Sequence, residues 1–152
     1  MKIKLTSENE TKQFGAALFQ AIRSPYLIFL QGNLGAGKTT LASGFIQASE
    51  YKGAVKSPTY TIVEEYQAHG KNIYHFDLYR LSDPEELEWI GFKDYLDSDS
   101  ICLVEWPEKG TGFLPQPDLI LLLTVCDEGR QVVINARNSE IGKALSTLQA
   151  KY

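Results

Sequence analysis

The sequence predicts a single α/β domain over residues 1–152, with a mixed, partly parallel central sheet flanked by helices. Apolar, β-prone runs alternate along the chain with segments of helical periodicity, which is the order of an α/β fold. Two of these runs, 26–30 and 101–104, are apolar at every position, as in strands of a parallel sheet that are buried on both faces. A length of 152 residues is typical of one domain, and no linker or low-complexity tract divides it.

The first elements are a short strand over 2–6 and a helix that ends at about Arg23. Ser7 and Glu10 fit a capping box, in which a hydroxyl and a carboxylate meet the free N–H groups of a new helix. Apolar residues then recur at helical spacing. After the buried strand at 26–30, a glycine-rich turn leads to a second predicted helix over 39–49.

Two β-hairpins are predicted farther along. β-prone runs at 60–66 and 73–77 flank the polar turn 67–72. A second pair of runs, at 119–125 and 131–136, flanks another polar turn. Antiparallel pairs of this kind beside buried parallel strands would make the sheet mixed.

The remaining elements lie between and after the hairpins. Pro84, at a first helical position with acids after it, predicts a short helix over 85–89. Gly91 ends that helix, and the buried strand at 101–104 follows. A terminal helix over 139–149 completes the predicted fold.

Composition and charge are those of an ordinary soluble protein, with 43% hydrophobic and 22% charged residues and a net charge of −4. The slight acidity argues against a protein that grips nucleic acid by itself, because that task needs clustered Lys and Arg. No apolar stretch reaches the length of a signal peptide or of a membrane span, which needs about 20 residues. We therefore expect a cytoplasmic protein with no membrane attachment.

Cysteine and histidine are scarce. Cys102 and Cys126 each lie in an apolar run, which favours two buried thiols over a disulfide. Two histidines and no Cys-x-x-Cys pair are too few for a metal cluster of the Cys/His type.

A phosphate-binding motif lies between the buried strand 26–30 and the helix 39–49. Residues 32–39 match G-x-x-x-x-G-K-[ST], so the domain is predicted to be a P-loop NTPase. In a P-loop, backbone N–H groups and the helix N-terminus meet a phosphate, the lysine reaches the outer phosphates, and the Ser or Thr hydroxyl coordinates Mg²⁺. The predicted nucleotide contacts are Gly32, Asn33, Leu34, Gly35, Ala36, Gly37, Lys38, Thr39 and Thr40. The alternative is a glycine-rich turn whose lysine is merely exposed.

Two carboxylates lie at the ends of predicted strands and are candidates for the same site. Glu105 directly follows the strand 101–104, where the acid of a Walker B element holds or orients Mg²⁺. Asp77 closes the strand 73–77. Together with Thr39 they are the predicted metal ligands, and the alternative is a pair of ordinary surface carboxylates.

Lys38, Asp77 and Glu105 are the predicted catalytic residues, and Thr59, in Ser57-Pro58-Thr59-Tyr60, is a fourth candidate. This segment lies between the helix after the P-loop and the next strand, the position of a switch loop whose hydroxyl senses the metal and the γ-phosphate. A simple turn with a favourably placed proline fits the same residues.

In this arrangement the chain resembles the TsaE family (also called YjeE), bacterial ATPases required for threonylcarbamoyl modification of the tRNA adenosine beside the anticodon. The ordered set of motifs is what makes the resemblance specific, since a P-loop alone would identify only a superfamily. The segments that carry it are 32–40, 57–61, 75–81 with 83–87, and 104–107.

The resemblance implies binding of ATP and ADP, Mg²⁺ held by Thr39 with Glu105, and a need for Asp77 in hydrolysis or metal placement. It further implies that Trp106 shapes the site, and that Thr6 to Glu8 and the region of Arg130 contact the adenine. Family members join a complex with TsaD and TsaB. Their ATP hydrolysis resets the TsaD–TsaB machinery between rounds. The tRNA would then be met only indirectly.

Two rival functions share the P-loop. A nucleoside or metabolite kinase usually has an arginine-bearing lid, and four scattered arginines make a poor one. A guanine-nucleotide switch needs an Asn-Lys-x-Asp motif, which the chain lacks. Because no arginine finger can be assigned, we expect slow hydrolysis by the isolated chain and stimulation by partners.

Overall fold

The computed structural model describes residues 1–23, 25–55, 61–68 and 70–151. In chain order the elements are β1 (Lys2–Leu5), α1 (Glu8–Ala21), β2 (Tyr26–Gln31), α2 (Lys38–Ala48), β3 (Val63–Ala68), β4 (Lys71–Asp77), α3 (Glu86–Trp89), η1 (Phe92–Tyr95), β5 (Ser100–Glu105), η2 (Pro107–Gly110), β6 (Leu119–Cys126), β7 (Gly129–Ala136) and α4 (Ser139–Lys151), where η marks a 3₁₀ helix.

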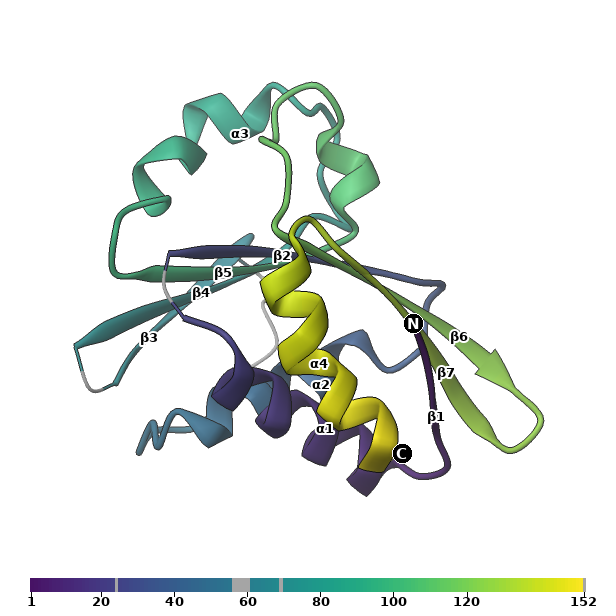
Figure 1. Ribbon diagram of the computed structural model, residues 1–152. Coiled ribbons are helices and arrows are strands. Elements are labelled where there is room, and N and C mark those ends of the chain that lie inside the picture. Colours follow the sequence, from purple (N-terminus) through teal and green to yellow (C-terminus); the bar gives the residue numbers. More distant parts are fainter. Residues whose placement is uncertain (24, 56–60, 69, 152) are drawn as a thin grey trace.

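The described strands form one seven-stranded sheet in the order β1-β7-β6-β2-β5-β4-β3 (Figure 1). β2 lies at the centre and runs parallel to both β5 and β6, and β4 is parallel to β5. The pairs β3–β4, β6–β7 and β1–β7 are antiparallel. The predicted α/β fold with a mixed, partly parallel sheet is confirmed.

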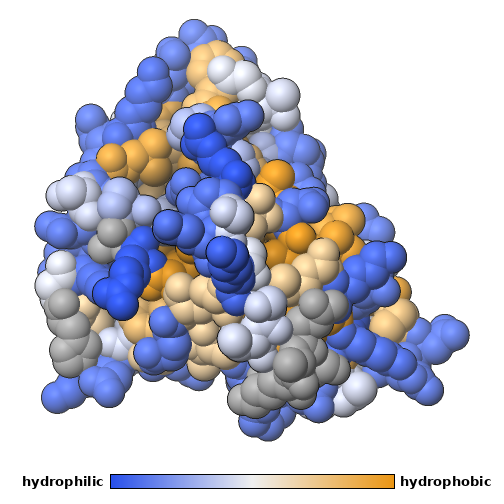
Figure 2. All heavy atoms as spheres, viewed as in Figure 1, coloured by the Kyte–Doolittle hydropathy of each residue, from blue (hydrophilic) through white to orange (hydrophobic). Residues whose placement is uncertain are grey.

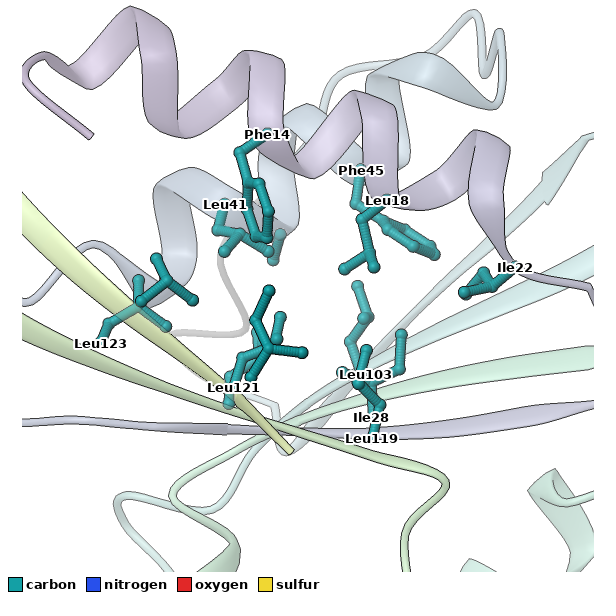
Figure 3. Close-up of a cluster of buried hydrophobic side chains, with 14 of the residues drawn as sticks. Phe14, Leu18, Ile22, Ile28, Leu41, Phe45, Leu103, Leu119, Leu121 and Leu123 are labelled. Atoms are coloured by element: carbon teal, nitrogen blue, oxygen red, sulfur yellow. The ribbon is translucent and has the colours of Figure 1, made fainter. Parts of the chain in front are cut away.

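Helices cover both faces of this sheet. α1, α2 and α4 lie on one face, and α3 lies with the short 3₁₀ helices on the other (Figure 1). Each face has its own apolar cluster. Phe14, Leu18 and Phe45 from the helices pack with Leu103 from β5 in the first (Figure 3). The second is built around Phe76, Phe92 and Val104 among others, so successive residues of β5 enter opposite clusters, as expected for a strand buried on both faces.

α1 and α2 approach each other closely because glycines stand at their contact. A Cβ on Gly15 would lie 2.2 Å from the carbonyl oxygen of Leu41, and one on Gly44 would lie 2.1 Å from that of Lys12. Neither position has room for a side chain. The close packing fixes α2, and with it the loop that precedes it, against the rest of the fold.

The start of α1 follows the predicted cap. The Ser7 hydroxyl accepts a hydrogen bond from the Glu10 N–H at 3.1 Å. The Glu10 carboxylate in turn accepts one from the N–H of Thr6 at 2.7 Å, one residue earlier than a capping box requires. The helix direction is thereby set where β1 ends.

Two expectations are wrong. The turn 67–72 is shorter than predicted, because β3 and β4 keep pairing as far as Ala68 and Lys71. Cys126 is exposed rather than buried, since it is the last residue of β6, where the hairpin extends beyond the core. Cys102 is buried as expected, and neither thiol is in a disulfide.

The side of the molecule seen in Figure 1 carries mostly hydrophilic side chains, with smaller apolar groups between them (Figure 2). Of the helices in the described ranges, none combines the length and the apolar character that crossing a membrane would need.

Candidate functional site

The P-loop connects the central strand β2 to α2. Gly32 has a φ of +148°, and a Cβ there would lie 2.5 Å from the Leu123 carbonyl oxygen of β6, so no other residue fits at the start of the loop. Gly37 caps α2 with a φ of +106°. The loop thus leads directly into the helix N-terminus, whose free N–H groups and positive dipole end suit an anion.

Lys38 turns back over its own loop. Its Nζ donates a hydrogen bond to the Gly32 carbonyl and lies 3.6 Å from the centre of the Trp106 ring. The residue is 4% exposed. Burial lowers the pKa of the Lys38 ammonium, although nearby carboxylates oppose that shift. A buried cation of this kind is well placed to gain from an incoming phosphate.

Thr39 and Glu105 meet beside the loop. The Thr39 hydroxyl lies 3.0 Å from Oε1 and 3.3 Å from Oε2 of Glu105 and donates to this carboxylate. Glu105 is the last residue of β5 and is only 2% exposed. A hydroxyl and a carboxylate are hard oxygen ligands of the type that Mg²⁺ takes in nucleotide sites.

Asp77 lies next to Glu105, because the two residues are register partners at the ends of the parallel strands β4 and β5. One Asp77 oxygen accepts a hydrogen bond from the backbone N–H of Tyr79 at 3.0 Å. Desolvation by burial raises the pKa of the Asp77 carboxyl, while the Tyr79 hydrogen bond acts in the opposite direction. The site therefore holds two neighbouring carboxylates in different environments.

Trp106 forms one wall of the site. It has a left-handed backbone, with a φ of +56°, immediately after Glu105 and before η2. Its ring lies 5.0 Å from that of Tyr79, at an angle of 49°. The two rings and the Lys38 ammonium form a contiguous group, and no motif in the sequence assigned Tyr79 to the site.

A cavity of about 450 Å³ gathers these residues. P-loop residues from Leu34 to Thr40 line it, together with the ends of β4 and β5. The loop between β1 and α1 contributes Thr6 to Glu8, and the β6–β7 hairpin contributes Arg130, so both segments expected near an adenine open onto the same space. Arg130 also donates from Nη2 to the Gly35 carbonyl at 3.2 Å. Thr59 lies outside the described residues.

His75 is a second residue of this region that the sequence did not predict. It lies on β4 two residues before Asp77, on the same face of the strand, and its Nε2 is 2.5 Å from Oε2 of Glu105. The signal in the sequence was the His-x-Asp spacing, since alternate residues of a strand share a face. That spacing does not reveal that the neighbouring strand carries a glutamate.

Within the described ranges, no three His, Cys, Asp or Glu side chains gather closely enough to hold a metal ion by themselves. Thr39, Glu105 and Asp77 bring side-chain oxygens to the loop that could coordinate a metal ion. These are the groups that could share a metal with a bound phosphate.

Comparison with known proteins gives a consistent result. The family model described as "Threonylcarbamoyl adenosine biosynthesis protein TsaE" matches residues 5–132. The tRNA threonylcarbamoyladenosine biosynthesis protein TsaE of Haemophilus influenzae is 54% identical over 117 residues, which cover 77% of this chain and 73% of that protein. Its namesake from Bacillus subtilis is 36% identical over 138 residues, 90% of this chain and 85% of that protein. The crystal structure of Bacillus subtilis YdiB superposes with a TM-score of 0.76 at 28% identity, covering 99% of this chain and 95% of that one.

Proposed function

Because the chain belongs to the TsaE family, and so has a role in the biosynthesis of the threonylcarbamoyladenosine modification of tRNA, we propose that it is a Mg²⁺-dependent ATPase of that pathway. It acts in the cytoplasm in a complex with TsaD and TsaB and meets tRNA only indirectly. Its 152 residues work as one nucleotide-binding domain. The observation that carries the proposal is the contact of the Thr39 hydroxyl with the buried Glu105 carboxylate beside a P-loop.

Nucleotide binding is assigned to the P-loop and its surroundings. Backbone N–H groups of 32–40 cradle the phosphates, and Lys38 exchanges the Gly32 carbonyl for phosphate oxygens. The adenine lies toward Thr6 to Glu8 and Arg130, which line the same cavity. A volume of about 450 Å³ falls within the range of ordinary ligand sites.

Thr39 and Glu105 would hold Mg²⁺ together with phosphate oxygens, and Asp77 would hold or orient it from the neighbouring strand. When bound, this ion offsets negative charge on the phosphates. Asp77 and Glu105 also stand where an attacking water would be oriented. In the reaction, the water oxygen bonds to the γ-phosphorus as the bond to the β-phosphate oxygen of ADP breaks, and the proton of the water passes to a carboxylate or phosphate oxygen. Thr59 is proposed as the hydroxyl that responds to the γ-phosphate.

The rival kinase function would need an acceptor and an arginine-bearing lid. Of the arginines, Arg130 is the one that lines the cavity in the described structure, and its guanidinium is held by the Gly35 carbonyl. Thin-layer chromatography of a reaction with labelled ATP and candidate acceptors separates the two functions. Label recovered as inorganic phosphate would support ATP hydrolysis. Label recovered on an acceptor molecule would instead show that the protein is a kinase.

Partner dependence gives the second test. Phosphate release is measured for the chain alone, with TsaD and TsaB, and with both partners and the Lys38→Ala variant. We expect slow release alone, faster release in the complex and loss of the stimulated rate in the variant. Full activity of the isolated chain would contradict the proposed partner dependence, and equal competition of GTP with ATP for binding would contradict the assignment of ATP.

A further inference from the structure

His75 is buried behind the cavity rather than in it. It is 1% exposed and, unlike Asp77 and Glu105, is not among the residues that line the cavity. Its position follows from the register of the sheet. Asp77 pairs with Glu105 at the strand ends. His75 lies two residues earlier along β4, on the same face of the sheet and farther from the strand end. From this position the ring contacts Glu105 but does not extend into the cavity, where a bound molecule would lie.

The ring donates to Glu105. Its Nε2 lies 2.5 Å from Oε2 of Glu105, and an ionised carboxylate can only accept. At the other ring nitrogen, Nδ1, no hydrogen-bond partner exists among the described residues. Since a buried N–H without an acceptor costs more than a buried lone pair in a ring, we assign the proton to Nε2.

Glu105 is consequently held from two sides. The Thr39 hydroxyl meets the carboxylate at 3.0 Å and 3.3 Å from the P-loop side, and the His75 ring meets Oε2 from within the sheet. A glutamate side chain has three rotatable bonds, and one contact to a short hydroxyl leaves its carboxylate free to turn. The second hydrogen bond, from a ring that packing immobilises, fixes the plane of the carboxylate and offsets the cost of burying its charge.

We propose that His75 is the positioning residue that orients Glu105 toward Thr39, so that both present their oxygens together to a nucleotide-bound Mg²⁺. This inference rests on the proposed function, because it concerns the same metal. Partners that hydrogen-bond to a ligating carboxylate set its orientation and govern metal affinity in this way. His75 touches no reacting atom, so its contribution is to metal-assisted binding and not to chemistry.

Two amide variants test whether the hydrogen bond to Glu105 matters, because both keep a polar side chain and only one can place its N–H₂ group at the position of the ring Nε2. In His75→Gln the side-chain N–H₂ group extends as far as Nε2 of the ring and can still donate to Glu105. In His75→Asn the same group stops near the position of Nδ1 and cannot. Phe76→Leu serves as a control for a damaged core, because Phe76 is fully buried on the opposite face of the same strand.

Binding of a non-hydrolysable ATP analogue is measured by calorimetry for each protein, once with Mg²⁺ and once with EDTA. The ratio of the two affinities reports the metal contribution. We expect His75→Asn to reduce this ratio about tenfold or more, with the affinity in EDTA unchanged within about twofold. His75→Gln should recover most of the loss, and Phe76→Leu should keep the wild-type ratio despite a lower unfolding temperature.

A wild-type ratio in His75→Asn would overturn the positioning role while leaving the proposed function intact. A loss shared equally by His75→Gln, His75→Asn and Phe76→Leu would also overturn it, since the effect would then be one of general packing. Failure of the wild-type protein to bind the analogue under either condition would instead overturn the proposed function, and this inference with it.

Discussion

The Lys38 ammonium lies 3.6 Å from the centre of the Trp106 ring, with the Gly32 carbonyl as its hydrogen-bond acceptor. A cation over an indole face is stabilised by the ring quadrupole, and the carbonyl supplies a neutral partner. Neither neutralises the charge. The fold therefore keeps the Lys38 cation buried, at a cost that desolvation imposes.

This cost predicts a pH-dependent stability. The pKa of Lys38 is lowered from the ordinary value of 10.5, so below the folded pKa both states are charged and the fold bears the full penalty. As pH rises toward 10.5, the folded state loses its proton first, and stability recovers. Lys38→Met should therefore be more stable than the wild type at pH 7, with the advantage shrinking by pH 10. Thermal unfolding without nucleotide measures it, and an advantage that does not change with pH would contradict the burial of the charge.

Asp77 predicts the opposite trend in the acid range. Its pKa is raised from 3.8 by burial, so the folded state binds more protons than the unfolded state between that value and the raised one. Stability contributed by this group is present at low pH and is lost as pH rises through the folded pKa. We expect Asp77→Asn to gain about 1–3 °C in unfolding temperature relative to the wild type between pH 3.5 and pH 7. Scans of both proteins across that range are the measurement, and a constant difference would rule out the shift.

The glycines at the helix contact predict a sharp contrast between two identical changes. Gly44→Ala places a Cβ 2.1 Å from the Lys12 carbonyl oxygen, which forces α1 and α2 apart and should cost more than about 2 kcal/mol. Gly142→Ala lies in α4 with nothing within 4 Å of the new Cβ and should stabilise by up to about 1 kcal/mol. Denaturant unfolding compares them. Similar free energies for the two variants would contradict the close packing of α1 on α2.

Arg130 predicts a loss of affinity without a loss of fold. It lines the cavity and donates to the Gly35 carbonyl, so Arg130→Ala removes both a wall of the site and a tether on the loop. We expect ATP binding to weaken about five- to tenfold, or about 1 to 1.4 kcal/mol. Arg137→Ala, at a position that does not line the cavity, is the matched control. If the two variants bound ATP equally well, Arg130 would have no part in the site.

Local patterns predicted most of the elements, because the signals lie within a few residues. Eight consecutive residues were enough to predict the P-loop, and unbroken apolar runs were enough to predict β2 and β5. Asp77 and Glu105 could be singled out because each closes a strand, and parallel strands end at one edge of a sheet.

The rest depended on which strands become neighbours. The order of the sheet places β4 beside β5 and so brings His75 to Glu105 across 30 residues of sequence. No local pattern encodes that pairing. The exposure of Cys126 likewise depends on how far the β6–β7 hairpin extends past the core. The left-handed backbone of Trp106 stands at the N-cap of the short helix η2, which no pattern in the sequence predicted.

Phosphate release by the complex with TsaD and TsaB, compared between the wild type and Glu105→Ala at saturating ATP and Mg²⁺, tests the central claim most directly. Glu105 meets Thr39 beside the P-loop, so its loss should reduce the rate about 100-fold or more, while ATP binding in EDTA stays near the wild-type level. Hydrolysis by Glu105→Ala at the wild-type rate would contradict the assignment of this carboxylate, and with it the proposed Mg²⁺-dependent mechanism.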